Sequence, residues 1–122
     1  MGEFDWVTAR SECSEIAVFE AMKAGAERDA KMRHNLPETK SGYRFVADRD
    51  SFSVVLEGPL GKHIVRFRIE NKSITASLDD RPFLKGTVTL SDDGICRLSV
   101  EGQDLEFWQF RKRALEHLFF GF

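Results

Sequence analysis

Between Tyr43 and Val100, apolar and polar side chains alternate with a period of two residues. This alternation is typical of strands that are buried on one face only. Turn sequences rich in Gly, Pro, Asn and Asp interrupt it at short intervals, as in EGPLGK, ENKS and SDDG, and such residues favour tight hairpin turns. The pattern predicts strands at residues 43–47, 51–57, 62–70, 73–79, 83–90, 95–100 and 104–107.

The alternation assigns the side chains of these strands to two faces of one sheet. We expect an apolar face made of Tyr43, Phe45, Phe52, Val54, Leu56, Val65, Phe67, Ile69, Ile74, Ala76, Leu78, Leu84, Val88, Leu90, Cys96, Leu98 and Val100. We expect a polar face made of Arg44, Ser53, Glu57, Lys62, Arg66, Arg68, Glu70, Thr75, Ser77, Asp79, Thr87, Thr89, Arg97 and Ser99. The apolar face needs a cover, whereas the polar face suits water.

A single helix is predicted ahead of the sheet, from Thr8 or Ser11 to His34. Ser11 and Ser14 are both candidates for its N-terminal cap, and Asn35-Leu36-Pro37 ends it. Apolar residues that recur every three or four positions form one stripe, with Val18 at its edge: Ile16, Phe19, Met22, Ala26 and Ala30.

The terminal segment FWQFRKRALEHLFFGF predicts a second amphipathic helix that begins near Glu106. Its apolar arc contains Phe107, Trp108, Phe110, Ala114, Leu115, Leu118 and Phe119, opposite Lys112, Arg113, Glu116 and His117. Arg111 falls inside the apolar arc, so we expect it to reach a carboxylate or water. Phe120 and Phe122 do not fit the arc and are expected to be exposed.

Together these elements predict an α+β fold in which residues 1–122 form a single domain. The N-terminal helix is followed by a bent antiparallel meander of about six to seven strands. The C-terminal amphipathic helix is expected to pack on the apolar face of the sheet.

The composition narrows the range of partners and compartments. The formal net charge of −2 argues against general nucleic-acid binding. The sequence contains no run of about 20 apolar residues, so we expect no integral membrane association. Glu3 and Asp5 stand where a signal peptide would be basic. Cys13 and Cys96 are expected to be buried free thiols rather than a disulfide, which favours a cytoplasmic protein.

Catalytic and cofactor signatures are not evident in the sequence. It contains no nucleophile elbow, phosphate-binding loop or dinucleotide fingerprint. His34, His63 and His117 lie on separate predicted elements, so we expect no metal site and no cofactor. These observations favour a protein that is not an enzyme.

Three hypotheses for function remain. The favoured one is an interaction module that forms a homodimer or binds a protein partner through Arg113, His117, Phe120 and Phe122. The alternative is a carrier that holds a small apolar ligand between the sheet and the helices, near Tyr43, His63 and Trp108. The least favoured is an anion-binding row formed by Lys62, Arg66 and Arg68, which neighbouring carboxylates are expected to neutralise.

Overall fold

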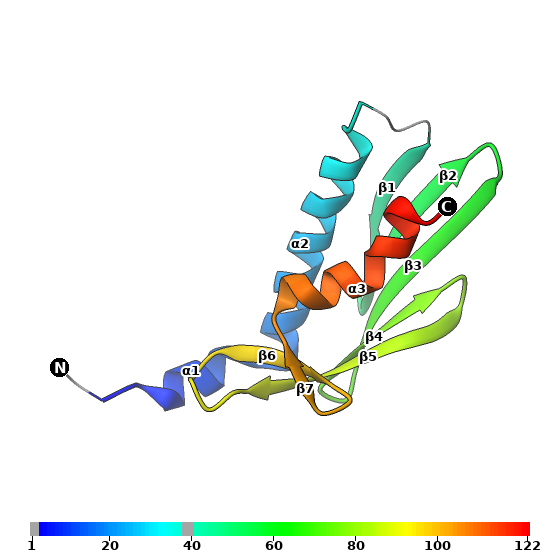
Figure 1. The fold of residues 1–122 in the computed structure, drawn as a ribbon. Coiled ribbons are helices and arrows are strands. Elements are labelled where there is room, and N and C mark those ends of the chain that lie inside the picture. The colour runs from blue at the N-terminus through cyan, green and yellow to red at the C-terminus, as the bar shows by residue number, and fades with distance from the viewer. Residues whose placement is uncertain (1–2, 38–40) are drawn as a thin grey trace.

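The computed structural model describes residues 3–37 and 41–122. Within these ranges the chain forms an α+β fold of three helices and a seven-stranded antiparallel sheet (Figure 1), as predicted. The helices are α1 (Trp6–Glu12), α2 (Glu15–His34) and α3 (Phe107–Phe120). The strands are β1 (Gly42–Ala47), β2 (Ser51–Gly58), β3 (Gly61–Glu70), β4 (Ser73–Leu78), β5 (Arg81–Leu90), β6 (Cys96–Val100) and β7 (Gln103–Leu105).

The sheet is a simple meander in which each strand pairs with the next strand along the chain. Two-residue turns with positive φ join β3 to β4, β4 to β5 and β6 to β7, at Asn71-Lys72, Asp79-Asp80 and Glu101-Gly102. This geometry matches the twist of an antiparallel hairpin, and Asn, Asp and Gly adopt it most readily. The predicted strands differ from the observed ones mainly at their ends.

Both α2 and α3 lie on the same side of the sheet (Figure 1). The apolar face predicted from alternation forms the sheet half of the core. Its most buried members are Phe52, Val54, Val65, Phe67, Ile74, Ala76 and Leu98. Phe52 is the centre of an aromatic cluster, stacked on Phe67 at 4.7 Å and in contact with Phe19 of α2 at 5.2 Å, both measured between ring centroids.

The predicted N-terminal helix is two helices, so the prediction of one continuous helix is wrong. The chain leaves helical geometry at Cys13, and Ser14 begins α2 by accepting a hydrogen bond from the Ala17 N–H at 3.1 Å. Phe19, Met22, Ala26 and Ala30 are buried as predicted, but Ile16 is exposed. Because Ile16 lies in the first turn of α2, it extends beyond the part of the helix that faces the core.

α3 packs on the apolar face of the sheet through Phe110, Ala114, Leu115, Leu118 and Phe119, as the helical projection predicts. A reciprocal capping box between Glu106 and Gln109 begins the helix. Trp108 is an exception, since 53% of its surface is exposed. It lies in the first turn of α3 and lines a hollow together with residues of α2.

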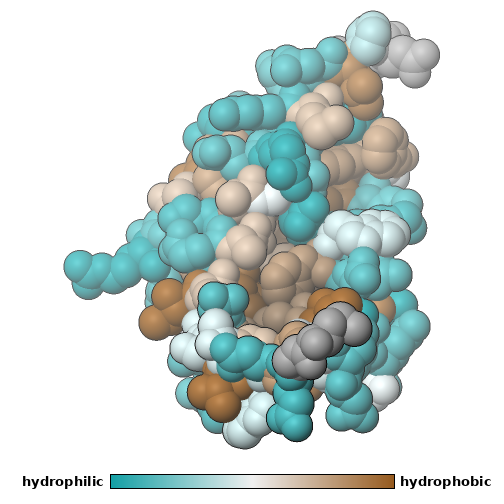
Figure 2. Space-filling view, turned by 90° about the vertical axis from the view of Figure 1, so that its left-hand side faces the viewer, coloured by the Kyte–Doolittle hydropathy of each residue, from teal (hydrophilic) through white to brown (hydrophobic). Residues whose placement is uncertain are grey.

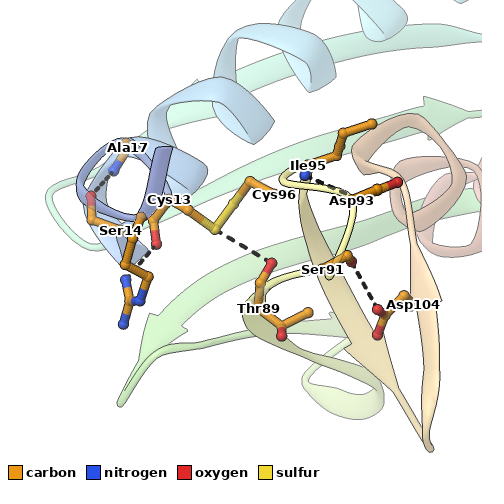
Figure 3. Close-up of a disulfide and its surroundings, with 10 residues drawn as sticks. Cys13, Ser14, Ala17, Thr89, Ser91, Asp93, Ile95, Cys96 and Asp104 are labelled. Atoms are coloured by element: carbon orange, nitrogen blue, oxygen red, sulfur yellow. Dashed lines mark hydrogen bonds between the residues drawn. A yellow bond between two sulfur atoms is a disulfide. The ribbon is translucent and has the colours of Figure 1, made fainter. Parts of the chain in front are cut away.

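The two cysteines form a disulfide, so the prediction of free thiols is wrong (Figure 3). Cys13 lies at the end of α1 and Cys96 begins β6, with 5.4 Å between their Cα atoms. Sequence separation gave no indication of this proximity because it depends on the break between α1 and α2. The Cys13 side chain also lies beside the Thr89 carbonyl oxygen, at 3.4 Å.

Candidate functional site

A groove runs between α2 and α3, the two helices that cover the sheet, with a volume of about 430 Å³. We call it the interhelical groove. Its apolar lining consists of Met32, Leu36, Trp108, Leu115, Phe119 and Phe120, and its charged margin consists of Asp29, Arg33, Arg111, Lys112 and Glu116. The groove exposes apolar surface to solvent, because four of its large apolar side chains are exposed: Met32, Leu36, Trp108 and Phe120.

An ion pair joins the two helices at the groove. Arg111 Nε on α3 donates a hydrogen bond to Asp29 Oδ2 on α2, at 2.7 Å. The sequence predicted that Arg111 would need a carboxylate, and Asp29 is that carboxylate. Gly25 makes room for the guanidinium, because a Cβ at this position would lie only 2.5 Å from Arg111 Nη1.

The α3 side of the groove has a regular surface pattern. Trp108, Lys112, Glu116 and Phe120 follow one another at intervals of four residues, so they form one inclined line along the helix that turns by about 40° at each step. We call this line the α3 stripe. Lys112 and Glu116 form an ion pair at 3.2 Å in its middle, and exposed aromatic residues occupy both of its ends.

Contacts within the chain hold the aromatic ends of the stripe in place. Trp108 Nε1 donates to Glu106 Oε2 at 2.9 Å. The Arg33 guanidinium lies over the Phe120 ring, 4.8 Å from its centroid, while Arg33 Nε donates to the Phe119 carbonyl oxygen at 2.8 Å. The two rings are therefore ordered before any partner binds.

A second hollow lies on the other side of the α3 C-terminus, where the β2–β3 hairpin meets the end of the chain. This hairpin hollow has a volume of about 300 Å³. Its lining combines Tyr43, Leu56, Pro59, Leu60, His63 and Phe122 with Arg33 and Ser41. Tyr43 and His63, two of the three residues predicted to bind a ligand, therefore line one space, whereas Trp108 lines the interhelical groove.

His63 is held in a fixed orientation in the hairpin hollow. Its Nδ1 lies 2.7 Å from Asp79 Oδ2, and its ring stacks on the Phe122 ring with 3.9 Å between centroids and 13° between planes. Asp79 in turn accepts a hydrogen bond from the Ile64 N–H at 2.8 Å. Desolvation tends to raise the pKa of Asp79, but the hydrogen bonds from His63 and Ile64 and the His63 charge outweigh it and lower the pKa below its ordinary value.

The basic row predicted on the polar face is present but divided. Arg66 and Arg68 line a hollow of about 210 Å³ together with Thr75, Ser77, Glu70 and Asp80, and Lys62 lies outside it. Arg66 pairs with Asp80 at 3.3 Å and Arg44 pairs with Glu57 at 2.8 Å. Asp79, one of the carboxylates predicted on the polar face, bonds to His63 instead. Anion binding by Lys62, Arg66 and Arg68 stays a prediction.

The four residues predicted to form an interface do not all share one surface, although His117 and Phe122 are in contact. Phe120 belongs to the α3 stripe, whereas Phe122 lines the hairpin hollow. Arg113 donates to Gln103 of β7 at 3.2 Å, and the His117 ring contacts Phe122 with 4.5 Å between centroids. Within the described ranges, no three His, Cys, Asp or Glu side chains are grouped as metal ligands would be.

Sequence reasoning missed Met32, Leu36 and Arg33 as members of a surface. Nothing in the sequence indicates that the end of α2 lies beside α3. The spacing of Trp108, Lys112, Glu116 and Phe120 was visible in the sequence, since four-residue intervals mark one line on a helix.

Comparison with models of known families, with curated proteins and with solved structures found no match for this chain. Among the described helices, none has both the length and the apolar character that crossing a membrane requires. The described ranges thus form an α+β fold with two surface hollows beside α3 and a third on the polar face of the sheet.

Proposed function

We propose that this protein is a small interaction module that forms a homodimer through the α3 stripe and the interhelical groove. The observation that supports this proposal most strongly is the symmetry of the stripe. Trp108 and Phe120 stand six residues on either side of Ala114, and Lys112 and Glu116 stand two residues on either side of it. The stripe is therefore complementary to itself when a second copy runs in the opposite direction.

A twofold axis perpendicular to α3, at the level of residue 114 but on the side of the helix away from the buried Ala114 side chain, gives this pairing. Trp108 then meets Phe120 of the partner subunit, and Lys112 meets Glu116 of the partner subunit. Every contact occurs twice, as an interface between identical copies requires. The aromatic residues would lie about 9 Å from the axis on each side, given the rise of an α-helix.

The chemistry of the stripe suits an interface between proteins. Exposed Trp and Phe side chains provide the apolar area that dominates binding energy at interfaces. Lys112 and Glu116 pair with each other in one chain and can exchange partners across the axis without leaving a charge unpaired. Arg33 and Arg111 are already engaged by groups of the same chain, so the dimer does not need to compensate them.

Charge reversal tests the pairing directly. In Lys112→Glu the stripe carries two Glu, and in Glu116→Lys it carries two Lys, so each variant should repel a copy of itself and remain monomeric. An equimolar mixture should form a heterodimer, because both cross-axis pairs then join opposite charges. Light scattering after size exclusion gives the mass of each sample. The doubly reversed variant should dimerise like the unmodified chain.

The mixture separates the proposal from an effect on folding. Each single variant loses the exposed pair within its own helix, which contributes only about 0.3–0.5 kcal/mol, and mixing two chains cannot restore that pair within either one. A mixture that stays monomeric, while the unmodified chain dimerises, contradicts the antiparallel arrangement. An unmodified chain that is monomeric at all concentrations contradicts self-association itself.

The compartment in which the module works also needs reconsideration. The cytoplasmic location expected from the sequence stays a prediction, but it rested partly on free thiols, and Cys13 and Cys96 are bonded. Disulfides persist mainly in oxidising compartments, so the bond favours such a location. Rapid alkylation of the protein in its own cells distinguishes the two, because a modified thiol pair indicates a reducing compartment.

A further inference from the structure

We infer that the free edge of β1 binds an extended segment of a partner protein as an additional strand of the sheet. β1 is the outermost strand on one side of the sheet and pairs only with β2 (Figure 1). Its other edge therefore presents backbone groups that no described strand pairs. This edge is a different surface from the α3 stripe, and the inference does not depend on dimerisation.

Alternate residues of β1 direct their backbone groups away from β2. Two hydrogen bonds fix this alternation. The Asp48 N–H donates at 2.8 Å to a carbonyl oxygen of β2, whereas the Tyr43 N–H donates at 3.2 Å to His34 Nδ1 of α2. Because the two directions alternate along a strand of an antiparallel pair, the backbone groups of Phe45 and Ala47 face outward like those of Tyr43.

These outward groups are open to a partner. In the part of the chain that the structure describes, the N–H and carbonyl groups of Phe45 and Ala47 have no hydrogen-bond partner. An extended segment offers acceptors and donors at the same spacing, so a strand that runs antiparallel to β1 can bond all of them. The chemistry of the edge thus selects an extended backbone as its ligand.

The edge lacks the features that usually prevent such pairing. Proteins protect exposed edges with Pro, Lys, bulges or very short strands. β1 contains no Pro or Lys and pairs with β2 without a bulge. Its one charged side chain, Arg44, is held by Glu57 of β2 at 2.8 Å. β7, at the opposite edge of the sheet, is only three residues long and offers less backbone to a partner.

A hollow beside the edge can receive a side chain of the added strand. It has a volume of about 240 Å³, and Ala30, Tyr43 and Phe45 line it together with polar residues near the end of α2. Residues directly opposite each other in a sheet place their side chains on the same face. The residue that pairs with Phe45 therefore points into this hollow, and we expect it to be Val, Ile or Leu.

A partner segment suits this edge better than β1 of a second copy does. A twofold axis that pairs two antiparallel β1 strands runs perpendicular to the sheet, so both copies keep their helices on the same face. α2 lies beside β1 in each copy (Figure 1), and this pairing would bring the two α2 helices together at the junction. A single extended segment carries no such helix.

Amide hydrogen exchange of the intact chain, followed by NMR, tests whether the edge is free. The amides of Phe45 and Ala47 should exchange at least about tenfold faster than those of Arg44 and Val46, which face β2. Equal protection of all four amides overturns the free edge. Protection of Phe45 that grows with protein concentration overturns the partner segment in favour of a second copy.

A capped peptide of alternating Val and Thr, with Lys at each end, is the probe for binding. We expect saturable binding that slows exchange at Phe45 and Ala47. N-methylation of the Val amides, which face β1 when the Val side chains enter the hollow, should weaken binding at least about tenfold. N-methylation of the Thr amides, which face away, should change it less than about threefold. Equal effects of the two modifications, or no saturable binding, overturn the inference.

Ala47 allows a matched pair of variants, because it is exposed at the end of β1 and its N–H faces outward. Ala47→Pro removes this donor and leaves the bonds between β1 and β2 intact, as Pro does on edge strands. Ala47→Thr keeps the donor. Both variants should unfold at similar urea concentrations, and Ala47→Pro should bind the probe about tenfold more weakly than Ala47→Thr. Equal binding by the two variants would overturn the inference.

Discussion

Gly25 is the residue that lets the two helices share an ion pair. It lies in the middle of α2, where glycine costs helix stability relative to alanine by roughly 0.5–1 kcal/mol. The structure supplies a reason for accepting this cost. The Arg111 side chain is largely buried and occupies the space that a Cβ on Gly25 would need.

We predict that Gly25→Ala changes stability in opposite directions depending on residue 111. In the unmodified chain the added methyl group displaces the Arg111 guanidinium from Asp29, and we expect a net destabilisation of about 1–2 kcal/mol. In an Arg111→Ala background no guanidinium is present, so the helix preference of alanine should stabilise the protein by roughly 0.5–1 kcal/mol. Urea unfolding of the four proteins measures both changes.

Measuring Gly25→Ala both with Arg111 and with Arg111→Ala provides the control. If Gly25→Ala stabilises both proteins, the guanidinium moves aside without cost and the ion pair does not constrain the helix spacing. If it destabilises both, contacts other than Arg111 limit the space at Gly25.

Asp79 makes the stability of the fold depend on pH in the acid range. Because hydrogen bonds from His63 and the Ile64 N–H lower its pKa in the folded state, the stability it contributes is present above the ordinary aspartate pKa. That contribution is lost as the pH falls through the lowered, folded-state pKa. The loss therefore occurs below about pH 4, under the ordinary range for aspartate.

We predict that Asp79→Asn is less stable than the unmodified chain at about pH 5, and that the difference narrows towards about pH 2, where the native carboxylate is also protonated. Urea unfolding across this range measures the difference. Asp92→Asn, at an exposed turn position, serves as the control. A difference that stays constant with pH would contradict the assigned role of the Asp79 charge.

At the scale of elements, α1 differs from the rest of the molecule because none of its residues is buried. Figure 1 shows it at the N-terminal extremity, beside β6. Figure 2 views the molecule from this side and shows apolar side chains exposed between hydrophilic ones. The disulfide at Cys13, immediately after α1, is therefore its main attachment to the sheet, along with contact between the Phe4 ring and Gly94.

We predict that replacing both cysteines by serine loosens α1 selectively. Amide hydrogens of residues 6–12 should exchange faster, whereas those of α2 and the central strands should remain protected in the native state. The disulfide joins positions 83 residues apart, and removing such a link typically costs about 2–4 kcal/mol of unfolding free energy. Hydrogen exchange with mass spectrometry measures the first effect, and urea unfolding measures the second.

Unchanged exchange in α1 would show that packing around Phe4 and Trp6 is sufficient to hold the helix. In that case the disulfide contributes to global stability only, and the view of α1 as a tethered element is wrong.

The elements that could be predicted are those in which local pattern and burial agree. The strands and their apolar face follow from alternation because one side of the sheet is covered and the other is not, although Val55, on the polar side, is also buried between its cross-strand neighbours Arg44 and Ile64. Ser14 was one of the two predicted N-caps and it caps α2, but the separate helix α1 ahead of it was not predicted.

The candidate site was predicted only in part, because its two hollows depend on how distant elements meet. Tyr43 and His63 were selected individually, and the sheet register brings their strands to one end of the β2–β3 hairpin. Trp108 was placed in the apolar arc of the predicted helix and among the ligand-binding residues, yet about half of its surface is exposed. Its exposure depends on where α2 lies beside α3, which the spacing within either helix does not encode.

At the scale of the whole molecule, two helices cover one face of a single sheet and leave apolar surface between them. The opposite face carries the Arg66 and Arg68 side chains and their neighbouring carboxylates, so it is compatible with water. α2 and α3 bury the apolar face of the sheet, but Met32, Trp108 and Phe120 of these helices remain exposed in the interhelical groove. In the proposed dimer, a second copy that supplies the same residues in reverse order covers it.

Sedimentation equilibrium of the unmodified chain over a range of concentrations tests this central claim most directly. The account predicts a mass of twice the 14.0 kDa of one chain at high concentration. It also predicts dissociation to single chains on dilution, shifted to higher concentration by Trp108→Ala. A mass of one chain at every concentration would contradict it.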